Sequence, residues 1–336
     1  MQNEQVISYK EATGVIQYNM TNDYMFRYIL QKNQKVLKGL ICALLHLEPE
    51  EVQKVEITNP INLNEDIKDK EFILDIDVLL NDNTKIGLEM QVQDKQNWTE
   101  RSLAYLCRSF DQLYRGQEYE EALPVVHIGF LDYTLFPDVP EFYATNMLMN
   151  VKNHRIYSSK FKLSVVDLTK IEMATEEDKT YHIDYWARLF KAKTWEDIQM
   201  LAEKNEYLKE AAQSVYIANA DEMVRQKCLA REEAERHERT MKRNINLLKQ
   251  ENDTLKDDNV KLQDENAKLQ DENAKLQSEH SMMQKKTACD MVQSVDNLMK
   301  NLQLPLEKAC EALGKSVKEY NEAQKIINNS SESFPK

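Results

Sequence analysis

The chain has 336 residues, enough for a full core and an accessory region, with 44 Lys+Arg against 57 Asp+Glu and a net charge of −13. This acidity excludes indiscriminate electrostatic binding of nucleic acid over the whole surface. Five widely spaced cysteines without a Cys-x-x-Cys motif exclude a cysteine zinc cluster and favour a reducing compartment. No signal peptide is recognised and no apolar run approaches the roughly 18 residues of a membrane span, so we expect a cytoplasmic protein.

The first expected elements are mainly helical. Residues 1–20 are polar and predict a loose lead-in. Thr21, Asn22 and Asp23 offer capping side chains, and apolar residues at helical spacing follow them. We therefore predict one helix, or two in series, over 23–47. A short strand is expected within 50–58.

Residues 72–93, FILDIDVLLNDNTKIGLEMQVQ, predict a β-hairpin because apolar and polar residues alternate in both halves. The turn-forming residues at 81–83 fit a three-residue loop that pairs Leu80 with Thr84. This register places Asp75 opposite Glu89. A loop one residue longer would set polar side chains against apolar ones.

Two acids directly opposite each other on neighbouring strands repel, so this arrangement requires a compensating interaction. A divalent cation provides one, because hard cations prefer carboxylate oxygens and water. Asp77 is an extra acid on the same face, and Gly87 opposite it leaves room for a metal ion or a phosphate. The alternative is an ordinary solvated strand face, on which acids are common.

The chain continues with a predicted helix over 98–115 and strands over 124–131, 142–150 and 161–168. A polar boundary at 173–180 precedes an amphipathic helical stretch over 182–220. The following segment, 225–243, is a highly charged helix. It is either a solvated helix with i,i+4 ion pairs or a helix that contacts phosphates. We expect domains over 21–175 and 181–243.

Heptads occupy residues 244–284. Leucine recurs at position d, asparagine holds most a positions, and LQDENAK is repeated in tandem at 262–268 and 269–275. This pattern predicts a parallel two-stranded coiled coil, and hence a homodimer, because paired Asn residues resist other registers. The alternative is a lone surface helix. Residues 287–327 predict a helical tail, either a small docking or helix-turn-helix-like module or a cap on the coil.

Several other kinds of site are absent from the sequence. The six histidines show no metal-ligand spacing, and His127 lies in an apolar strand where we expect a core residue. There is no Gly-rich phosphate loop and no Gly-x-Ser-x-Gly motif. The remaining candidate is Asp75 followed by Glu89 and Gln91, in which the acids hold a cation and Gln91 orients water by hydrogen bonding.

An ordered series of motifs carries a family resemblance: TNDYMF at 21–26, KEFILDI at 70–76, LEMQ at 88–91, then Glu100, Arg101, Tyr105, Gly116 and Tyr119, the strand at 124–136, Trp186 and the tail near Tyr320. It resembles the Rpn family of recombination-promoting nucleases and transposases, a branch of the PD-(D/E)XK nucleases. The resemblance implies an α/β, restriction-endonuclease-like core with a mixed central sheet flanked by helices. It also implies Asp75, Glu89 and Gln91 as catalytic residues, with Asp23 as a further acid able to reach the metal.

The expected function is a Mg²⁺-dependent DNA endonuclease, with Mn²⁺ as a possible substitute, associated with recombination or mobile elements. Asp75, Glu89 and Asp77 are the expected metal ligands. The alternative is a degenerate nuclease scaffold that acts in oligomerisation, DNA tethering or defence. Strand transfer by a three-acid transposase is disfavoured, because that chemistry places its acids on separate elements of a different fold.

Overall fold

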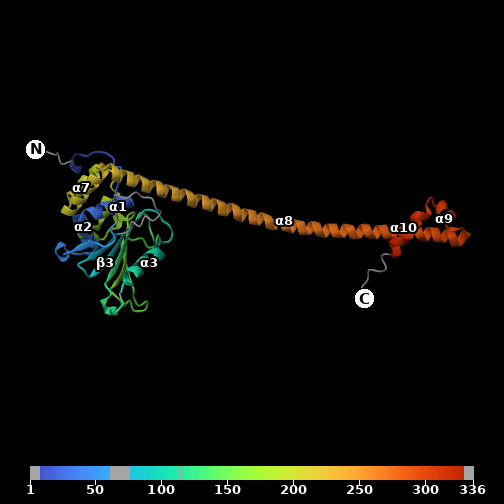
Figure 1. The fold of residues 1–336 in the computed structure, drawn as a ribbon, viewed down its shortest axis with the longest axis horizontal. Helices are drawn as coiled ribbons and strands as arrows, with labels where there is room; N and C mark the ends of the chain where they lie inside the picture. Colours follow the sequence, from blue (N-terminus) through green and yellow to red (C-terminus); the bar gives the residue numbers. More distant parts are fainter. Residues whose placement is uncertain (1–7, 61–75, 114, 329–336) are drawn as a thin grey trace. The chain divides into compact units, whose positions relative to one another are not determined.

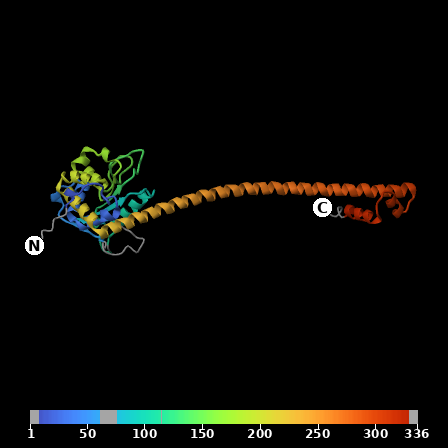
Figure 2. The same cartoon turned by 90° about the horizontal axis from the view of Figure 1, so that it is seen from above.

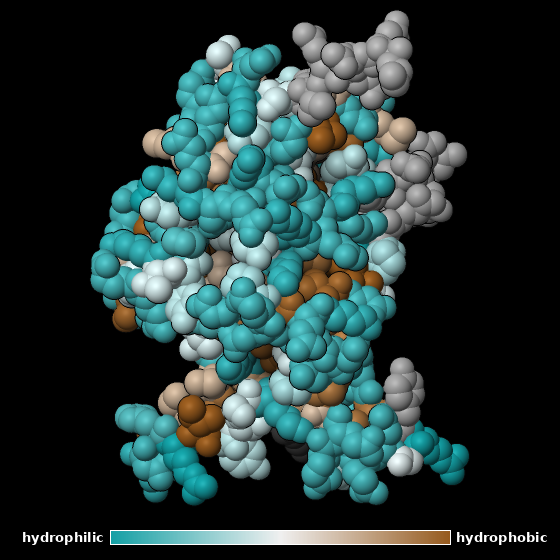
Figure 3. Space-filling view, turned by 90° about the vertical axis from the view of Figure 1, so that its left-hand side faces the viewer, coloured by the Kyte–Doolittle hydropathy of each residue, from teal (hydrophilic) through white to brown (hydrophobic). Residues whose placement is uncertain are grey.

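The computed structural model describes residues 8–60, 76–113 and 115–328. By its internal contacts the chain divides into two compact units, Met1–Thr240 and Met241–Lys336. No helix in the described ranges is long and apolar enough to cross a membrane. The face of the protein drawn in Figure 3 is mostly hydrophilic, with hydrophobic residues in scattered patches.

The first unit contains a six-stranded sheet in the order β1-β2-β3-β4-β6-β5. Its strands are β1 Val55–Ile57, β2 Ile76–Leu80, β3 Thr84–Gln91, β4 Val125–Leu131, β5 Tyr143–Met147 and β6 Phe161–Asp167. β3, β4 and β6 are parallel neighbours, whereas β1, β2 and β5 join antiparallel. The expectation of a mixed α/β sheet with flanking helices is confirmed.

Helices flank this sheet and also form the second unit (Figure 1). They are α1 Asp23–Lys32, α2 Gln34–Leu45, α3 Trp98–Phe110, α4 Glu176–Thr180, α5 Ile183–Lys191, α6 Trp195–Ala202, α7 Glu206–Ala220, α8 Glu222–Leu302, α9 Leu306–Ala312 and α10 Val317–Asn328. The stretch predicted over 23–47 is two helices. Asn33 ends the first, and its side chain accepts from Lys35 N and Val36 N to cap the second.

The hairpin register is confirmed wherever both strands are described. Leu80 pairs with Thr84, and the pairing continues to Ile76 and Leu88. Asn81 and Asp82 adopt positive φ angles of 49° and 56° in the loop, a conformation that Asn and Asp tolerate. Asp75, and with it the predicted pairing with Glu89, lies outside the described residues.

Different helices cover the two faces of the sheet. Phe26 of α1 packs on Phe130 of β4 with ring centroids 5.5 Å apart. On the other face, the α3 residue Trp98 lies so close to Gly129 that a Cβ there would be 2.0 Å from the indole. Consecutive strand residues point to opposite faces. The apolar face therefore lies under α1, and α3 covers the face that carries Glu89 and Gln91.

Residues 8–20 differ from the loose lead-in predicted for 1–20. Tyr9, Ile16, Tyr18 and Met20 are buried in the main core. The Asn219 side chain fixes this segment, because its Oδ1 accepts from Tyr18 N and its Nδ2 donates to Tyr18 O. Apolar residues spaced among polar ones give no periodic signal, so only their packing on α6 and α7 orders them.

The second unit contains the heptad segment of α8 followed by α9 and α10 (Figure 2). The heptad segment is helical throughout, while its pairing into a coiled coil remains a prediction. Pro305 precedes α9, and Gly314 follows it with a φ of 66°. The tail packs around a small core of four buried residues, Val295, Ala309, Cys310 and Tyr320. The Tyr320 hydroxyl donates to Asp296 of α8 at 2.7 Å.

Candidate functional site

Three of the residues singled out in the sequence lie around one small cavity. Asp23 is the first residue of α1, and Glu89 and Gln91 lie on β3 two residues apart, so they share one face of the sheet. All three line a cavity of about 40 Å³. Arg101 of α3 and Arg231 of α8 line it as well. Residues of α1, β3, α3 and α8, which are far apart in the chain, thus meet around this cavity.

Each of the three side chains holds a buried oxygen without a hydrogen-bond partner in the described part of the chain. These atoms are Asp23 Oδ1, Glu89 Oε2 and Gln91 Oε1, and their residues are only 7%, 2% and 6% exposed. Burying an unsatisfied polar atom costs about 1–3 kcal/mol, and more for a charged group. Three such acceptors around one cavity are a physical reason to expect a cationic ligand there.

The other oxygen of each carboxylate is held by an arginine. Arg231 donates to Asp23 Oδ2 from Nε at 2.6 Å. Arg101 Nη2 lies 2.7 Å from Glu89 Oε1. These ion pairs are short and largely shielded from water, which makes them stronger than surface pairs. They fix the two carboxylates through one oxygen each. Asp23 Oδ1 and Glu89 Oε2 are not used by these arginine contacts.

The amide of Gln91 has a defined orientation. Its Nε2 donates to the backbone oxygen of Gln93 at 3.1 Å and lies 3.1 Å from the Tyr133 hydroxyl. Because a carbonyl oxygen can only accept, the amide nitrogen must face Gln93. The amide oxygen is therefore the atom of Gln91 that is available as a metal or water ligand.

Burial raises the pKa of the Asp23 carboxyl from 3.8 to about 6, although Arg231 opposes the shift. A raised pKa means that folding favours the protonated acid. Asp23 therefore stabilises the fold below about pH 4, and this contribution is lost as the pH rises through about 6.

We expect Asp23→Asn to flatten the pH dependence of stability between pH 4 and 7, because asparagine does not titrate. A shift of about two pH units corresponds to roughly 3 kcal/mol, since one unit is about 1.4 kcal/mol. Urea unfolding of both proteins across this range measures the difference. Parallel stability curves for the wild type and the variant would contradict the raised pKa.

His127 is buried, as expected, but it also contacts the site. Its Nε2 lies 3.5 Å from Glu89 Oε2, and its ring stacks on Trp98 at 5.8 Å. The ring also takes the space over Gly87, where a Cβ would lie 2.8 Å from Nδ1. The room expected at Gly87 for a metal ion or phosphate therefore accommodates His127.

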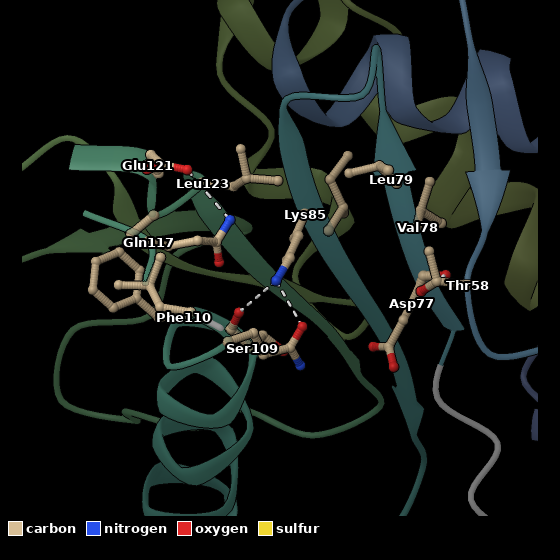
Figure 4. A pocket seen from close by; sticks show the side chains of 14 residues that line it. Thr58, Asp77, Val78, Leu79, Lys85, Ser109, Phe110, Gln117, Glu121 and Leu123 are labelled. Carbon is tan, nitrogen blue, oxygen red and sulfur yellow. Dashed lines mark hydrogen bonds between the residues drawn. The ribbon is translucent and has the colours of Figure 1, made fainter. Parts of the chain in front are cut away.

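Asp77 does not line this cavity, although its Oδ1 lies 3.8 Å from the position of a Cβ on Gly87, the place that His127 fills. It is paired with Gly87 in the hairpin, is exposed, and lines a larger hollow of about 490 Å³ between the hairpin and the end of α3 (Figure 4). Lys85 in the same hollow donates to Ser109 O at 3.4 Å and to Gln112 Oε1 at 2.6 Å. Burial lowers the pKa of Lys85. The polar face of the hairpin thus carries two separate hollows.

The structure brings together Asp23, Glu89 and Gln91 but not Asp77, and Asp75 lies outside the described residues. From the sequence alone we expected no site role for Arg231, Glu235 or His127. A signal existed for Arg231 alone, because the basic residues of 225–243 fit a helix that contacts phosphates. Nothing in the sequence distinguished His127 from an ordinary core histidine.

The side chains present fit a hard divalent cation in part. Asp23 and Glu89 supply carboxylates and Gln91 a neutral oxygen, which are the ligand types that Mg²⁺ accepts beside water. Within the described residues no group of three or more His, Cys, Asp or Glu side chains could hold a metal ion. A complete site therefore needs the Gln91 amide, water or Asp75.

A sequence model of the family described as PD-(D/E)XK nuclease family transposase matches residues 20–245. The match covers more than half of the chain and includes every residue of the cavity. A search of curated proteins gives no significant match, and neither does a search of solved structures.

Proposed function

The chain belongs to the PD-(D/E)XK nuclease family transposases, and from this premise we propose that it is a divalent-metal-dependent DNA endonuclease. PD-(D/E)XK nucleases generally use divalent metal ions. The single observation that carries the proposal is the set of three buried acceptor oxygens, on Asp23, Glu89 and Gln91, around one cavity. We propose an association with recombination or mobile elements on the basis of the family.

In this proposal Asp23, Glu89 and the amide oxygen of Gln91 hold the cation, together with Asp75 as the family resemblance implies. A bound divalent ion supplies charge that polarises a phosphodiester and lowers the pKa of a bound water. Gln91 carries no charge of its own, so only the acids offset the charge of the cation. Arg101 keeps the Glu89 carboxylate in place from α3.

Removing the metal tests this function directly. We expect the purified full chain to nick supercoiled plasmid DNA with Mg²⁺ or Mn²⁺ and to lose this activity completely in EDTA. Activity should return when excess Mg²⁺ is added. Cleavage that persists in EDTA at the same rate would contradict the proposed chemistry, and a parallel RNA substrate would show whether the activity is confined to DNA.

We also propose that the enzyme is a homodimer joined by a parallel coiled coil over 244–284. One stripe of α8 is exposed at every heptad, with the exposed fraction of its d residues between 56% and 72%: Leu248, Leu255, Leu262, Leu269, Leu276 and Met283. Six apolar side chains in line on one helix favour a second, identical helix as their cover. Two nuclease sites in one dimer suit cleavage of both DNA strands.

A second candidate function is a catalytically inactive scaffold that tethers DNA. It is favoured by the ion pairs of Asp23 with Arg231 and Glu89 with Arg101, since the arginines already compensate both carboxylates. Calorimetric titration with Mn²⁺ separates the two functions. Binding that is lost in Glu89→Gln supports the nuclease, whereas no Mn²⁺ binding supports the scaffold.

A further inference from the structure

The charged first part of α8 is held firmly beside the candidate site. Val224 and Cys228 are buried in the main core, and Asn22 Nδ2 donates to the backbone oxygen of Cys228 at 3.2 Å. Further along the helix, Gln93 Nε2 donates to Glu235 at 3.1 Å and Lys95 Nζ to Glu238 at 2.9 Å. These contacts on both sides of Arg231 fix its backbone at the cavity.

Arg231 and a divalent cation require the same carboxylate. Its Nε lies 2.6 Å from Asp23 Oδ2, and its side chain is only 19% exposed, so water screens it weakly. A cation held by Asp23 would face this guanidinium at short range. Like charges in such a site repel strongly, so the guanidinium must move when the metal enters.

Glu235 offers the guanidinium an alternative partner. It lies one helical turn further along α8, and its Oε1 is 3.7 Å from Arg231 Nε. Arg231 can therefore leave Asp23 and still remain paired with a carboxylate. The shift needs only a change of side-chain rotamer, because both glutamate and arginine belong to the same rigid helix.

We infer that Arg231 occupies the Asp23 carboxylate before metal binding, is displaced by the metal, and then binds a phosphate of the DNA. The inference rests on the proposed nuclease function. A guanidinium carries five N–H donors in a planar fork that matches phosphate oxygens. Arg231 would thus weaken metal binding in the free protein and strengthen DNA binding in the metal-loaded protein.

The first test measures Mn²⁺ affinity of the full chain by calorimetry. Arg231→Gln should bind Mn²⁺ about tenfold more tightly than the wild type, which corresponds to about 1.4 kcal/mol. Arg231→Lys retains the positive charge and should return the affinity toward the wild-type value. The control is Arg188→Gln, which breaks a two-bond pair with Glu172 away from the cavity and should leave Mn²⁺ affinity unchanged.

The second test measures DNA binding by fluorescence anisotropy, with Ca²⁺ as a probe cation and a short duplex as ligand. Arg231→Gln should bind about tenfold more weakly and lower the slope of log affinity against log salt by about one, as expected for one lost phosphate contact. Arg188→Gln should match the wild type. Circular dichroism checks that every variant is folded.

Two results would overturn the inference and separate it from the proposed function. If the wild type binds Mn²⁺ and Arg231→Gln binds it no more tightly, Arg231 does not compete with the metal. If DNA binding falls no further in Arg231→Gln than in Arg188→Gln, Arg231 does not hold a phosphate. A wild type that binds no Mn²⁺ overturns the nuclease proposal as well.

Discussion

Glu89→Gln is expected to lower plasmid cleavage by more than about a hundredfold, because groups that merely support a metal ligand are already worth ten- to a hundredfold. Glu89 is 2% exposed, lies between Arg101 and His127, and lines the cavity. Glutamine has the same size and can still accept from Arg101. The substitution thus removes the charge that would bind a cation and keeps the side-chain volume.

The matched control is Glu172→Gln, which makes the same chemical change at an exposed glutamate. Glu172 accepts from both terminal nitrogens of Arg188, at 3.1 and 3.2 Å. We expect this variant to cleave like the wild type, and both variants to show similar far-UV circular dichroism. Wild-type cleavage by folded Glu89→Gln would remove Glu89 from the catalytic site.

The double variant Leu262→Asp with Leu269→Asp is expected to convert the proposed dimer to a monomer. In a parallel dimer the change affects four side chains of one interface, and truncating a buried leucine costs about 2–5 kcal/mol. Four such losses sum to at least about 8 kcal/mol, which equals the roughly 8 kcal/mol that holds a dimer with a micromolar dissociation constant. Sedimentation velocity of the full chain in the micromolar range measures the mass directly.

Leu247→Asp with Val260→Asp is the control for this experiment. Both residues are exposed on the same helix, at the c and b positions of the heptads, and both gain the same charge. We expect this variant to remain a dimer. A wild-type chain that sediments as a monomer, or a stripe variant that remains a dimer, would contradict the coiled coil.

The two leading predictions concern different units of the chain and can be tested separately. Glu89→Gln should cleave poorly yet remain dimeric, because Glu89 lies in Met1–Thr240 and the heptads in Met241–Lys336. A monomeric leucine variant should retain Mn²⁺ binding. If nicking persists in the monomer while double-strand cleavage is lost, the dimer serves to place two sites on one DNA duplex.

Local patterns in the sequence determined much of the fold. The alternation of the hairpin and its Asn-Asp-Asn turn specified the pairing of Leu80 with Thr84, because a slip of one residue would expose an apolar face. Helical spacing and capping side chains located α1 and α2 to within two residues. Spacing also located the start of α3 at Trp98, but α3 ends at Phe110 and not near the predicted residue 115. The same local patterns selected Glu89 and Gln91, which share one face by strand geometry alone.

Only the tertiary structure decided which other residues join them. Arg231 lies 208 residues from Asp23 in the sequence, and no periodicity relates a helix start to an arginine so far away. The packing of α1 and α8 on the sheet creates that pair. It also seats His127 over Gly87 and leaves Asp77 in a separate hollow. Alternation specifies the face on which a side chain lies, whereas packing between distant elements specifies the neighbours that it meets there.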